Sequence, residues 1–244
     1  MRFDVLTIFP DLFDRVLGES IIGRAQANGL LSVNAVNIRD YTLDRHRKTD
    51  DYPYGGGNGL VMLAQPIYDA YMSIADGLDY KPKVIYMSPQ GEPLTQRKVE
   101  ELSACRHMVI LCGHYEGVDE RVLEEIVDEE ISIGDYVLTG GELPAMVLID
   151  AVSRTIPGVL SNEASYSDES HADGLLEYPQ YTRPQEFNGR TVPDVLMSGH
   201  HANINRWRRK QSLKRTFLRR PDLLQKLELS ADDGKLLEEA LKED

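Results

Sequence analysis

The hydrophobic residues of this chain fall into short runs that follow two different periodicities. Runs rich in β-branched and aromatic residues, which are typical of strands, occupy residues 2–9, 31–36, 83–87, 107–111 and 130–133. Segments with helical spacing or helix-start signals lie between them, beginning at Pro10 and then covering 65–77, 95–103, 119–127 and 141–152. This alternation is typical of βαβ units, so it predicts an α/β fold whose parallel sheet is covered on both faces.

The pattern changes after residue 160. Residues 161–173 are polar, rich in serine and without periodicity, which is typical of a flexible linker. Only helix signals follow, in a basic stretch, in the segment after Pro221 and in a last helix opened by Ser230. We therefore expect an α/β domain, a linker and a small all-helical domain, at residues 1–160, 161–173 and 174–244.

Hydrophobic residues never run more than five in a row, so we expect no membrane-spanning segment. Acidic residues interrupt the first 17 positions, and no apolar stretch of signal-peptide length is found there. Cys105 and Cys112 provide neither a disulfide framework nor the spacing of a zinc site. These observations favour a cytoplasmic protein without a membrane partner.

The charge of the chain is strongly segregated. Its formal net charge is −13, yet residues 195–221 contain eight Lys and Arg and no Asp or Glu, which leaves −21 on the remainder. Phosphate attraction depends on the local density of charge, so this stretch is a candidate surface for nucleic acid. A solvated helix face is the alternative, and the sequence does not decide between the two.

Glycines and polar residues gather after three of the predicted strands, in residues 88–91, 112–120 and 134–144. Open α/β sheets bind ligands beyond the carboxyl ends of their strands, and glycine lets a ligand approach the backbone closely. The segment 55–59 lacks the Lys-Ser/Thr of a phosphate loop, and the first strand enters its helix without Gly-x-Gly-x-x-Gly. His114, Glu116 and Asp119 lie in one turn without a second cluster, so we expect no protein-held metal.

The sequences Gly-His-Tyr-Glu-Gly-Val-Asp-Glu at 113–120 and Ser-Ile-Gly-Asp-Tyr-Val-Leu-Thr-Gly-Gly-Glu at 132–142 closely resemble the bacterial tRNA (guanine-N1)-methyltransferases. This family belongs to the SPOUT class of S-adenosylmethionine-dependent enzymes. The resemblance extends over nearly the whole chain, through the collinear segments 3–10, 50–57, 174–184 and 218–221.

The resemblance implies a homodimer whose α/β domain carries a deep trefoil knot, a rare exception to the rule that protein chains are unknotted. It also implies that S-adenosylmethionine binds in the knot and that Mg²⁺ assists, although the residues identify no Mg²⁺ ligands. Carried over by position, the expected cofactor contacts are Met87, Ser88, Gly113, Glu116, Gly117, Ile133, Gly134, Asp135, Tyr136, Val137, Leu138, Gly140, Gly141 and Pro144.

The implied reaction is methyl transfer to N1 of the guanine just 3′ of the tRNA anticodon. Neutral guanine carries a proton on N1, so a base must remove it while a cation stabilises the charge that spreads to O6. The family supplies an Arg at the position of Arg154 and an Asp in the linker. Here that Asp position holds Glu169, preceded by Asp168. We favour Glu169 as the base, because its spacing to Gly174 leaves no gap, and keep Asp168 as the alternative.

The resemblance implies that the basic stretch within residues 195–221 binds the anticodon arm of tRNA. Trp207 lies within it, three residues after Ile204, and this helical spacing favours a core position over a stacking platform without deciding the question. Arg39, Arg45, Arg47 and Lys48 form a candidate second basic patch. Two other functions stay open: a 2′-O-ribose RNA methyltransferase of the SPOUT class, and a non-catalytic RNA-binding protein.

Overall fold

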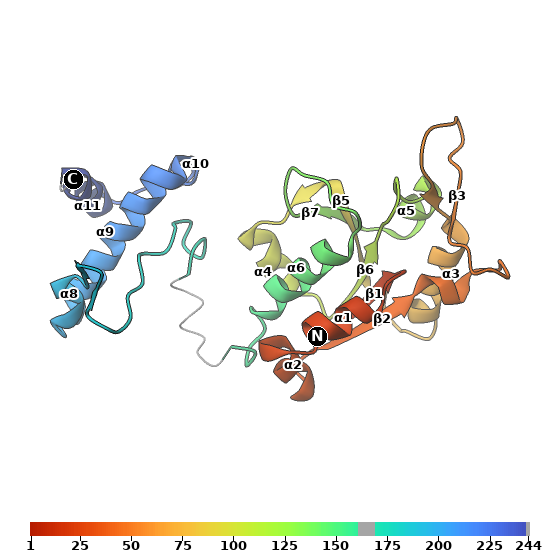
Figure 1. The fold of residues 1–244 in the computed structure, drawn as a ribbon, viewed down its shortest axis with the longest axis horizontal. Helices are drawn as coiled ribbons and strands as arrows, with labels where there is room; N and C mark the ends of the chain where they lie inside the picture. Colours follow the sequence, from red (N-terminus) through yellow and green to blue (C-terminus); the bar gives the residue numbers. More distant parts are fainter. Residues whose placement is uncertain (161–168, 243–244) are drawn as a thin grey trace. The chain divides into compact units, whose positions relative to one another are not determined.

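The computed structural model describes residues 1–160 and 169–242 (Figure 1). The chain divides into two compact units, Met1–Ser161 and Asn162–Asp244. Among the described helices, none combines the length and the apolar character needed to cross a bilayer.

A five-stranded sheet in the order β2-β1-β6-β5-β7 forms the centre of the larger unit. All of its strand pairs are parallel, which confirms the predicted α/β fold. Its strands are β1 (Arg2–Thr7), β2 (Ser32–Asn37), β5 (Lys83–Pro93), β6 (His107–Cys112) and β7 (Glu129–Ser132).

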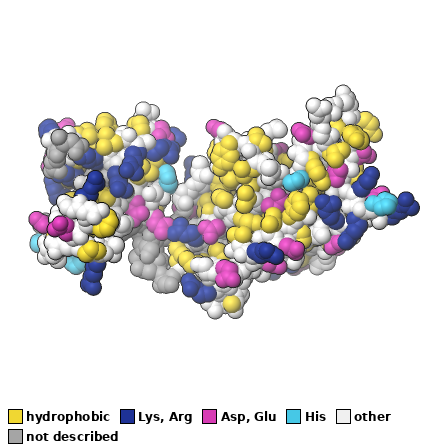
Figure 2. Space-filling model, in the orientation of Figure 1, with side chains coloured by type: hydrophobic (Ala, Val, Ile, Leu, Met, Phe, Trp, Pro, Cys, Tyr) yellow, Lys and Arg dark blue, Asp and Glu magenta, His cyan; other side chains and the backbone are white. Residues whose placement is uncertain are grey.

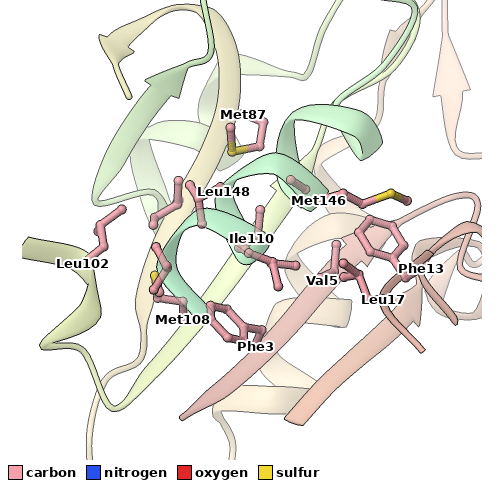
Figure 3. Close-up of a cluster of buried hydrophobic side chains, with 14 of the residues drawn as sticks. Phe3, Val5, Phe13, Leu17, Met87, Leu102, Met108, Ile110, Met146 and Leu148 are labelled. Atoms are coloured by element: carbon pink, nitrogen blue, oxygen red, sulfur yellow. The ribbon is translucent and has the colours of Figure 1, made fainter. Parts of the chain in front are cut away.

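Helices cover both faces of this sheet and enclose two hydrophobic cores. One face carries α1 (Asp11–Leu17), α2 (Ser20–Ala27), α4 (Gln96–Ser103) and α6 (Glu142–Ser153). The other carries the 3₁₀ helix η1 (Ile38–Tyr41), α3 (Ala64–Ala75) and α5 (Glu120–Ile126). Side chains alternate along each strand, so Met108 and Ile110 point into the first core while Val109 and Leu111 point into the second. Figure 3 shows Met108 and Ile110 packed with Phe3 and Leu148 in the first core.

Capping residues begin two of the predicted helices where the sequence places them. Thr95 accepts a hydrogen bond from the Lys98 N–H at 3.3 Å at the start of α4. Asp119 accepts one from the Arg121 N–H at 3.0 Å at the start of α5. Each satisfies a donor that the first turn of a helix leaves without a partner, which is why the sequence alone locates these ends.

Residues 39–59 are polar, a composition that favours a loop, yet the structure gives this segment short elements. Its start forms part of η1, and β3 (Asp50–Asp51) pairs antiparallel with β4 (Val61–Met62). The two-residue strands are too short for a period of two to be visible in the sequence.

The smaller unit is built around a core of Leu175, Leu213 and Leu236. The helices of its described residues are α8 (Asp194–Met197), α9 (His201–Arg219), α10 (Pro221–Leu224) and α11 (Ala231–Lys242).

The prediction of an all-helical second domain is wrong in one place. Strands β8 (Glu186–Phe187) and β9 (Arg190–Thr191) form an antiparallel hairpin. Its turn is Asn188-Gly189, and both residues have positive φ, at 51° and 74°. Asn-Gly is a strong signal for such a two-residue turn, so the sequence contained the evidence for this hairpin.

We expect Ile110→Ala to lower the free energy of unfolding of the larger unit by about 2–5 kcal/mol, because it leaves a cavity in a fully buried site of the central strand. Urea denaturation followed by circular dichroism measures this change. Leu43→Ala, at a side chain that is 86% exposed, is the control and is expected to leave the transition unchanged. Equal effects of the two substitutions would contradict the assignment of the core.

Candidate functional site

Three chain segments meet at the carboxyl edge of the sheet and enclose a pocket of about 380 Å³. They follow Met87 in β5, the end of β6 and the end of β7. These are the three strand ends that the sequence marks as rich in glycine. The volume lies within the range of small-molecule sites in proteins.

Strand β5 continues further than predicted, with an interruption that forms one wall of the pocket. Met87 and Glu92 both pair with Ile131 of β7, so the residues between them leave the ladder. Ser88, Pro89 and Gln90 in this bulge line the pocket. A bulge of this kind re-aims side chains at the edge of a sheet, and no period in the sequence signals it.

The segments after β6 and β7 are held together through their glycines. The Gly141 N–H donates to the Gly113 carbonyl at 2.8 Å, and His114 forms a bridge with Gly140. A Cβ on Gly141 would lie 2.8 Å from the Cα of Cys112, closer than such atoms approach one another in proteins. Glycine is therefore required at position 141 for the two segments to meet.

The segment after β6 is also fixed from its other side, by β4. Met62 donates its N–H to the Gly117 carbonyl at 2.9 Å and accepts the Asp119 N–H at 3.0 Å. Tyr115 has a φ of 59°, which is uncommon for a residue with a side chain, and its ring contacts the His114 ring edge-on at 4.8 Å. The described residues leave the His114 Nδ1 buried without a hydrogen-bond partner.

The charge of the pocket wall has one sign. Glu116, Glu120 and Glu130 line it, while none of its described lining residues is Lys or Arg. Carboxylates stabilise a nearby positive charge and repel a phosphate. The pocket therefore suits an uncharged or cationic ligand better than a nucleotide that carries phosphates.

Tyr86 is buried against Gly113 and lines the same pocket. Burial, together with the charges of Glu130 and Glu120, raises the pKa of Tyr86 to about 12. Its phenol is therefore protonated at neutral pH. Burial also raises the pKa of the Cys112 thiol well above its usual value, so this residue is a packing group and not a nucleophile.

Thirteen of the fourteen residues predicted to contact a cofactor line the pocket, and the exposed Asp135 does not. Twelve further lining residues were not predicted. Some of them extend the predicted segments by a neighbouring position, and others, such as Leu123 in α5, are brought in only by packing. They are Tyr86, Pro89, Gln90, His114, Tyr115, Val118, Glu120, Leu123, Glu130, Ile131, Ser132 and Thr139.

Of the predicted catalytic residues, Arg154 belongs to the same unit as the pocket but is not among the residues that line it. Arg154 lies at the C-terminal end of α6, whereas Gly141, at the N-terminal end of this helix, lines the pocket. A 12-residue helix is about 18 Å long, so the two ends are well separated. Glu169 belongs to the smaller unit, and Asp168 lies outside the described residues.

Residues 169–177 are folded onto the smaller unit. The Glu177 N–H donates to Ser170 Oγ at 2.9 Å, and the Leu176 N–H donates to Thr216 Oγ1 of α9 at 2.9 Å. Asp173 forms an ion pair with Arg209 of α9 at 2.5 Å. The carboxylate of Glu169 is thus carried by a structured segment, although the sequence assigns residues up to 173 to the linker.

Intramolecular ion pairs already engage part of the basic stretch. Arg206 pairs with Glu239 at 2.9 Å, Arg209 also pairs with Asp233 at 2.8 Å, and Arg220 pairs with Asp222 at 2.7 Å. Among the described residues, Arg208, Arg215 and Arg219 show no such ion pair. The described part of the chain contains no group of three or more His, Cys, Asp or Glu side chains that could hold a metal ion.

The free energy of unfolding of wild type should fall as the pH becomes alkaline, and we expect Tyr86→Phe to make this fall smaller. An unfolded tyrosine loses its proton near pH 10, whereas Tyr86 in the fold keeps it to about pH 12, so folding becomes less favourable as the pH rises between these values. Between about pH 10 and about pH 11, wild type should lose about 1 kcal/mol more than the variant. Urea denaturation at both pH values measures the free energy of unfolding. Tyr136→Phe, at an exposed side chain, is the control, and its free energy of unfolding should fall between the two pH values by as much as that of wild type. An equal fall in the free energy of unfolding for wild type and Tyr86→Phe would contradict the burial of the phenol.

A family model described as tRNA (Guanine-1)-methyltransferase TrmD matches residues 1–226 of the chain. A tRNA (guanine-N(1)-)-methyltransferase of Ruminiclostridium cellulolyticum is 70% identical over 227 residues, which are 93% of this chain and 97% of that protein. Proteins of the same name from Bacillus cereus and Staphylococcus aureus are 54% and 55% identical, over 100% and 98% of this chain and 100% and 96% of theirs. These matches confirm the resemblance seen in the sequence, and the chain belongs to the tRNA (Guanine-1)-methyltransferase TrmD family.

Proposed function

We propose that this protein transfers a methyl group from S-adenosylmethionine to N1 of the guanine immediately 3′ of the tRNA anticodon. The observation that carries the proposal is the acidic, glycine-walled pocket at the strand ends of a chain that belongs to this family. Its relatives are named for guanine-N1 methylation of tRNA.

The residues of the pocket fit S-adenosylmethionine. When bound, this cofactor supplies a methyl group on a positively charged sulfur, and the carboxylate of Glu116 on the pocket wall favours such a charge. Ile133 and Leu138 offer apolar surfaces for the faces of the adenine ring. Glycines on the pocket wall that are not fully buried, such as Gly117 and Gly140, let its polar edge approach the backbone closely.

The base and the cation that the reaction needs are assigned to Glu169 and Arg154. Removal of the N1 proton by the Glu169 carboxylate exposes the lone pair that attacks the methyl carbon. The bond from this carbon to sulfur would break at the same time, and its electron pair would stay on sulfur, which becomes neutral. The negative charge that then develops on O6 is stabilised by the Arg154 guanidinium. General-base help of this kind typically accelerates a reaction about 10²- to 10⁴-fold.

Arg154 reaches the pocket, in this proposal, from a second copy of the chain. Large hydrophobic residues are exposed one turn apart on α1, at Leu12 and Val16, and on α6, at Leu143 and Val147. The two helices pack against each other, and Figure 2 shows hydrophobic side chains gathered over them. An exposed apolar face of this kind marks an interaction site, and we propose that it forms the homodimer interface.

A two-fold axis perpendicular to α6 would pair this helix with its own copy in antiparallel orientation. The end of α6 that carries Arg154 would then lie beside the beginning of the second α6, which borders the pocket. This arrangement explains why Arg154 and the pocket lie at opposite ends of α6 within one chain.

Two further features of the family are part of the proposal. We propose that the larger unit is knotted, which is supported by the close pairing of the segments after β6 and β7 through Gly113 and Gly141. We also propose that α9 holds the anticodon arm through phosphate contacts of its basic residues. Mg²⁺ assistance stays a prediction of the resemblance, because no described cluster provides its ligands.

Incubation with labelled S-adenosylmethionine and tRNA transcripts that differ only in the base 3′ of the anticodon tests the function. We expect label only in the transcript with guanine, and N1-methylguanine in the digested nucleosides. A 2′-O-methylated nucleoside would instead support the ribose methyltransferase. A protein that binds RNA but shows no cofactor binding by calorimetry would be a non-catalytic RNA-binding protein.

We expect Glu169→Gln to lower single-turnover methylation about 10²- to 10⁴-fold, because the amide cannot accept the N1 proton. Cofactor affinity, measured by calorimetry, should stay at the wild-type value. Asp168→Asn is the matched control and should retain activity. An inactive Asp168→Asn together with an active Glu169→Gln would transfer the role of base to Asp168.

Mixed dimers test whether Arg154 acts on the pocket of the other copy. Arg154→Ala and Gly141→Ala homodimers should both be inactive, the second because its added Cβ displaces the backbone at Cys112. Coexpression should restore about a quarter of wild-type activity, because half of the dimers are mixed and each of these has one intact site. Failure to restore activity, with mixed dimers isolated and folded, would show that Arg154 acts within its own chain, and an active Arg154→Ala homodimer would show that Arg154 is not needed.

A further inference from the structure

Two aromatic side chains of the smaller unit, one of them in the basic helix α9, lie next to each other outside the hydrophobic core of this unit. Tyr181 and Trp207 have ring centroids 6.3 Å apart, with planes inclined at 54°. Tyr181 is 47% exposed and Trp207 is partly buried. Neither belongs to the hydrophobic core of the smaller unit, which consists of leucines.

A cation follows Trp207 along α9. The guanidinium of Arg208, the next residue along α9, lies over the ring of Tyr178 at 4.7 Å from its centre. Among the described residues no carboxylate pairs with Arg208, whereas the neighbouring Arg206 and Arg209 both form ion pairs. Its Nε is buried and has no hydrogen-bond partner in the described part of the chain. The Tyr178 ring thus orients a guanidinium whose charge is not neutralised locally.

We propose that Tyr181 and Trp207 stack an unpaired nucleobase of tRNA while Arg208 binds a phosphate of the same single-stranded segment. The inference rests on the proposed function and names a second contact with the substrate, made by residues other than those that line the pocket. An aromatic ring binds the face of any base, and a cation beside it binds the backbone, which is how single-stranded nucleic acid is generally held.

The charge around the aromatic residues favours RNA over a protein partner as the occupant. Residues 195–221 carry eight cationic and no anionic side chains, and Figure 2 shows Lys and Arg gathered over α9. Paired RNA would not present the faces of its bases, because its bases are stacked on one another. An exposed tyrosine ring gains contact area from a base only where the RNA is single-stranded.

Trp207 is the only tryptophan of the chain, so its fluorescence reports directly on this site. We would titrate the full-length protein with a synthetic RNA hairpin containing a single-stranded loop, and with a fully paired duplex that has the same number of phosphates. The hairpin should quench the emission by stacking. The duplex should bind, as measured by anisotropy of a labelled strand, without quenching. Equal quenching by both, or by neither, would overturn the proposal.

Variants of the exposed Tyr181 test the same contact through affinity and catalysis. Tyr181→Ala should weaken binding of the hairpin and raise KM for tRNA by at least about 5-fold, from the loss of one stacked base. The value of kcat and the KM for S-adenosylmethionine should not change. Tyr181→Phe keeps the ring and should behave as wild type.

Phe187→Ala is the matched control, because it removes an aromatic ring that is 68% exposed in the same unit. Its affinity for the hairpin and its KM should equal those of wild type. Equal losses in Phe187→Ala and Tyr181→Ala, or no loss in Tyr181→Ala, would overturn the stacking proposal.

Different results would refute the proposed methyl transfer and the proposed stacking of a base. Unchanged kinetics in Tyr181→Ala, with methylation by wild type intact, would refute stacking and leave the methyltransferase in place. Selective quenching by the hairpin without methylation of guanine would refute the proposed reaction and support stacking.

Discussion

The hydrogen bond of 2.8 Å between the Gly141 N–H and the Gly113 carbonyl joins the segments that follow β6 and β7. It exists only because the backbone at Gly141 approaches the Cα of Cys112 more closely than any side chain would allow. The remaining walls of the pocket are built on these two segments and on the bulge after Met87. A shift of one segment would therefore change the position of most groups that face a ligand.

The separation of charge between the two units gives each a different ligand preference. The pocket of the larger unit contains carboxylates and no described cation, whereas α9 in the smaller unit contains most of the basic residues of its region. Under the proposed function, a neutral base and a cationic cofactor can enter the pocket while the phosphates of the RNA are kept out of it. The phosphates are instead attracted to α9, although the net charge of the whole chain is −13.

Ion pairs within the smaller unit reduce the number of arginines that could bind RNA under the proposed function. Arg209 is bonded to Asp233 and to Asp173, and the second bond holds the segment that begins at Glu169 on α9. A charge count along the sequence treats every arginine alike. The fold divides them into those that form ion pairs within the unit and those, such as Arg208, for which the described residues show no carboxylate partner.

The five strands of the sheet, the caps at Thr95 and Asp119 and the three glycine-rich strand ends were predictable from the sequence, whereas α2 and the short pair β3 and β4 were not predicted. They depend on local periodicity and on backbone preferences, which neighbouring residues determine. The hairpin at Asn188-Gly189 was predictable on the same grounds. The sequence by itself thus determined the fold class, the edge of the sheet that carries the pocket and, by resemblance, the family.

Only the tertiary structure decided which side chains share the pocket and which are separated. It added Tyr86, Glu120 and Glu130 to the pocket wall, and it placed Arg154 at the far end of α6. These outcomes depend on strand register, on the bulge in β5 and on the direction of a helix after it leaves the sheet. Such properties arise from contacts between residues far apart in the chain, so no local pattern of residue types can specify them.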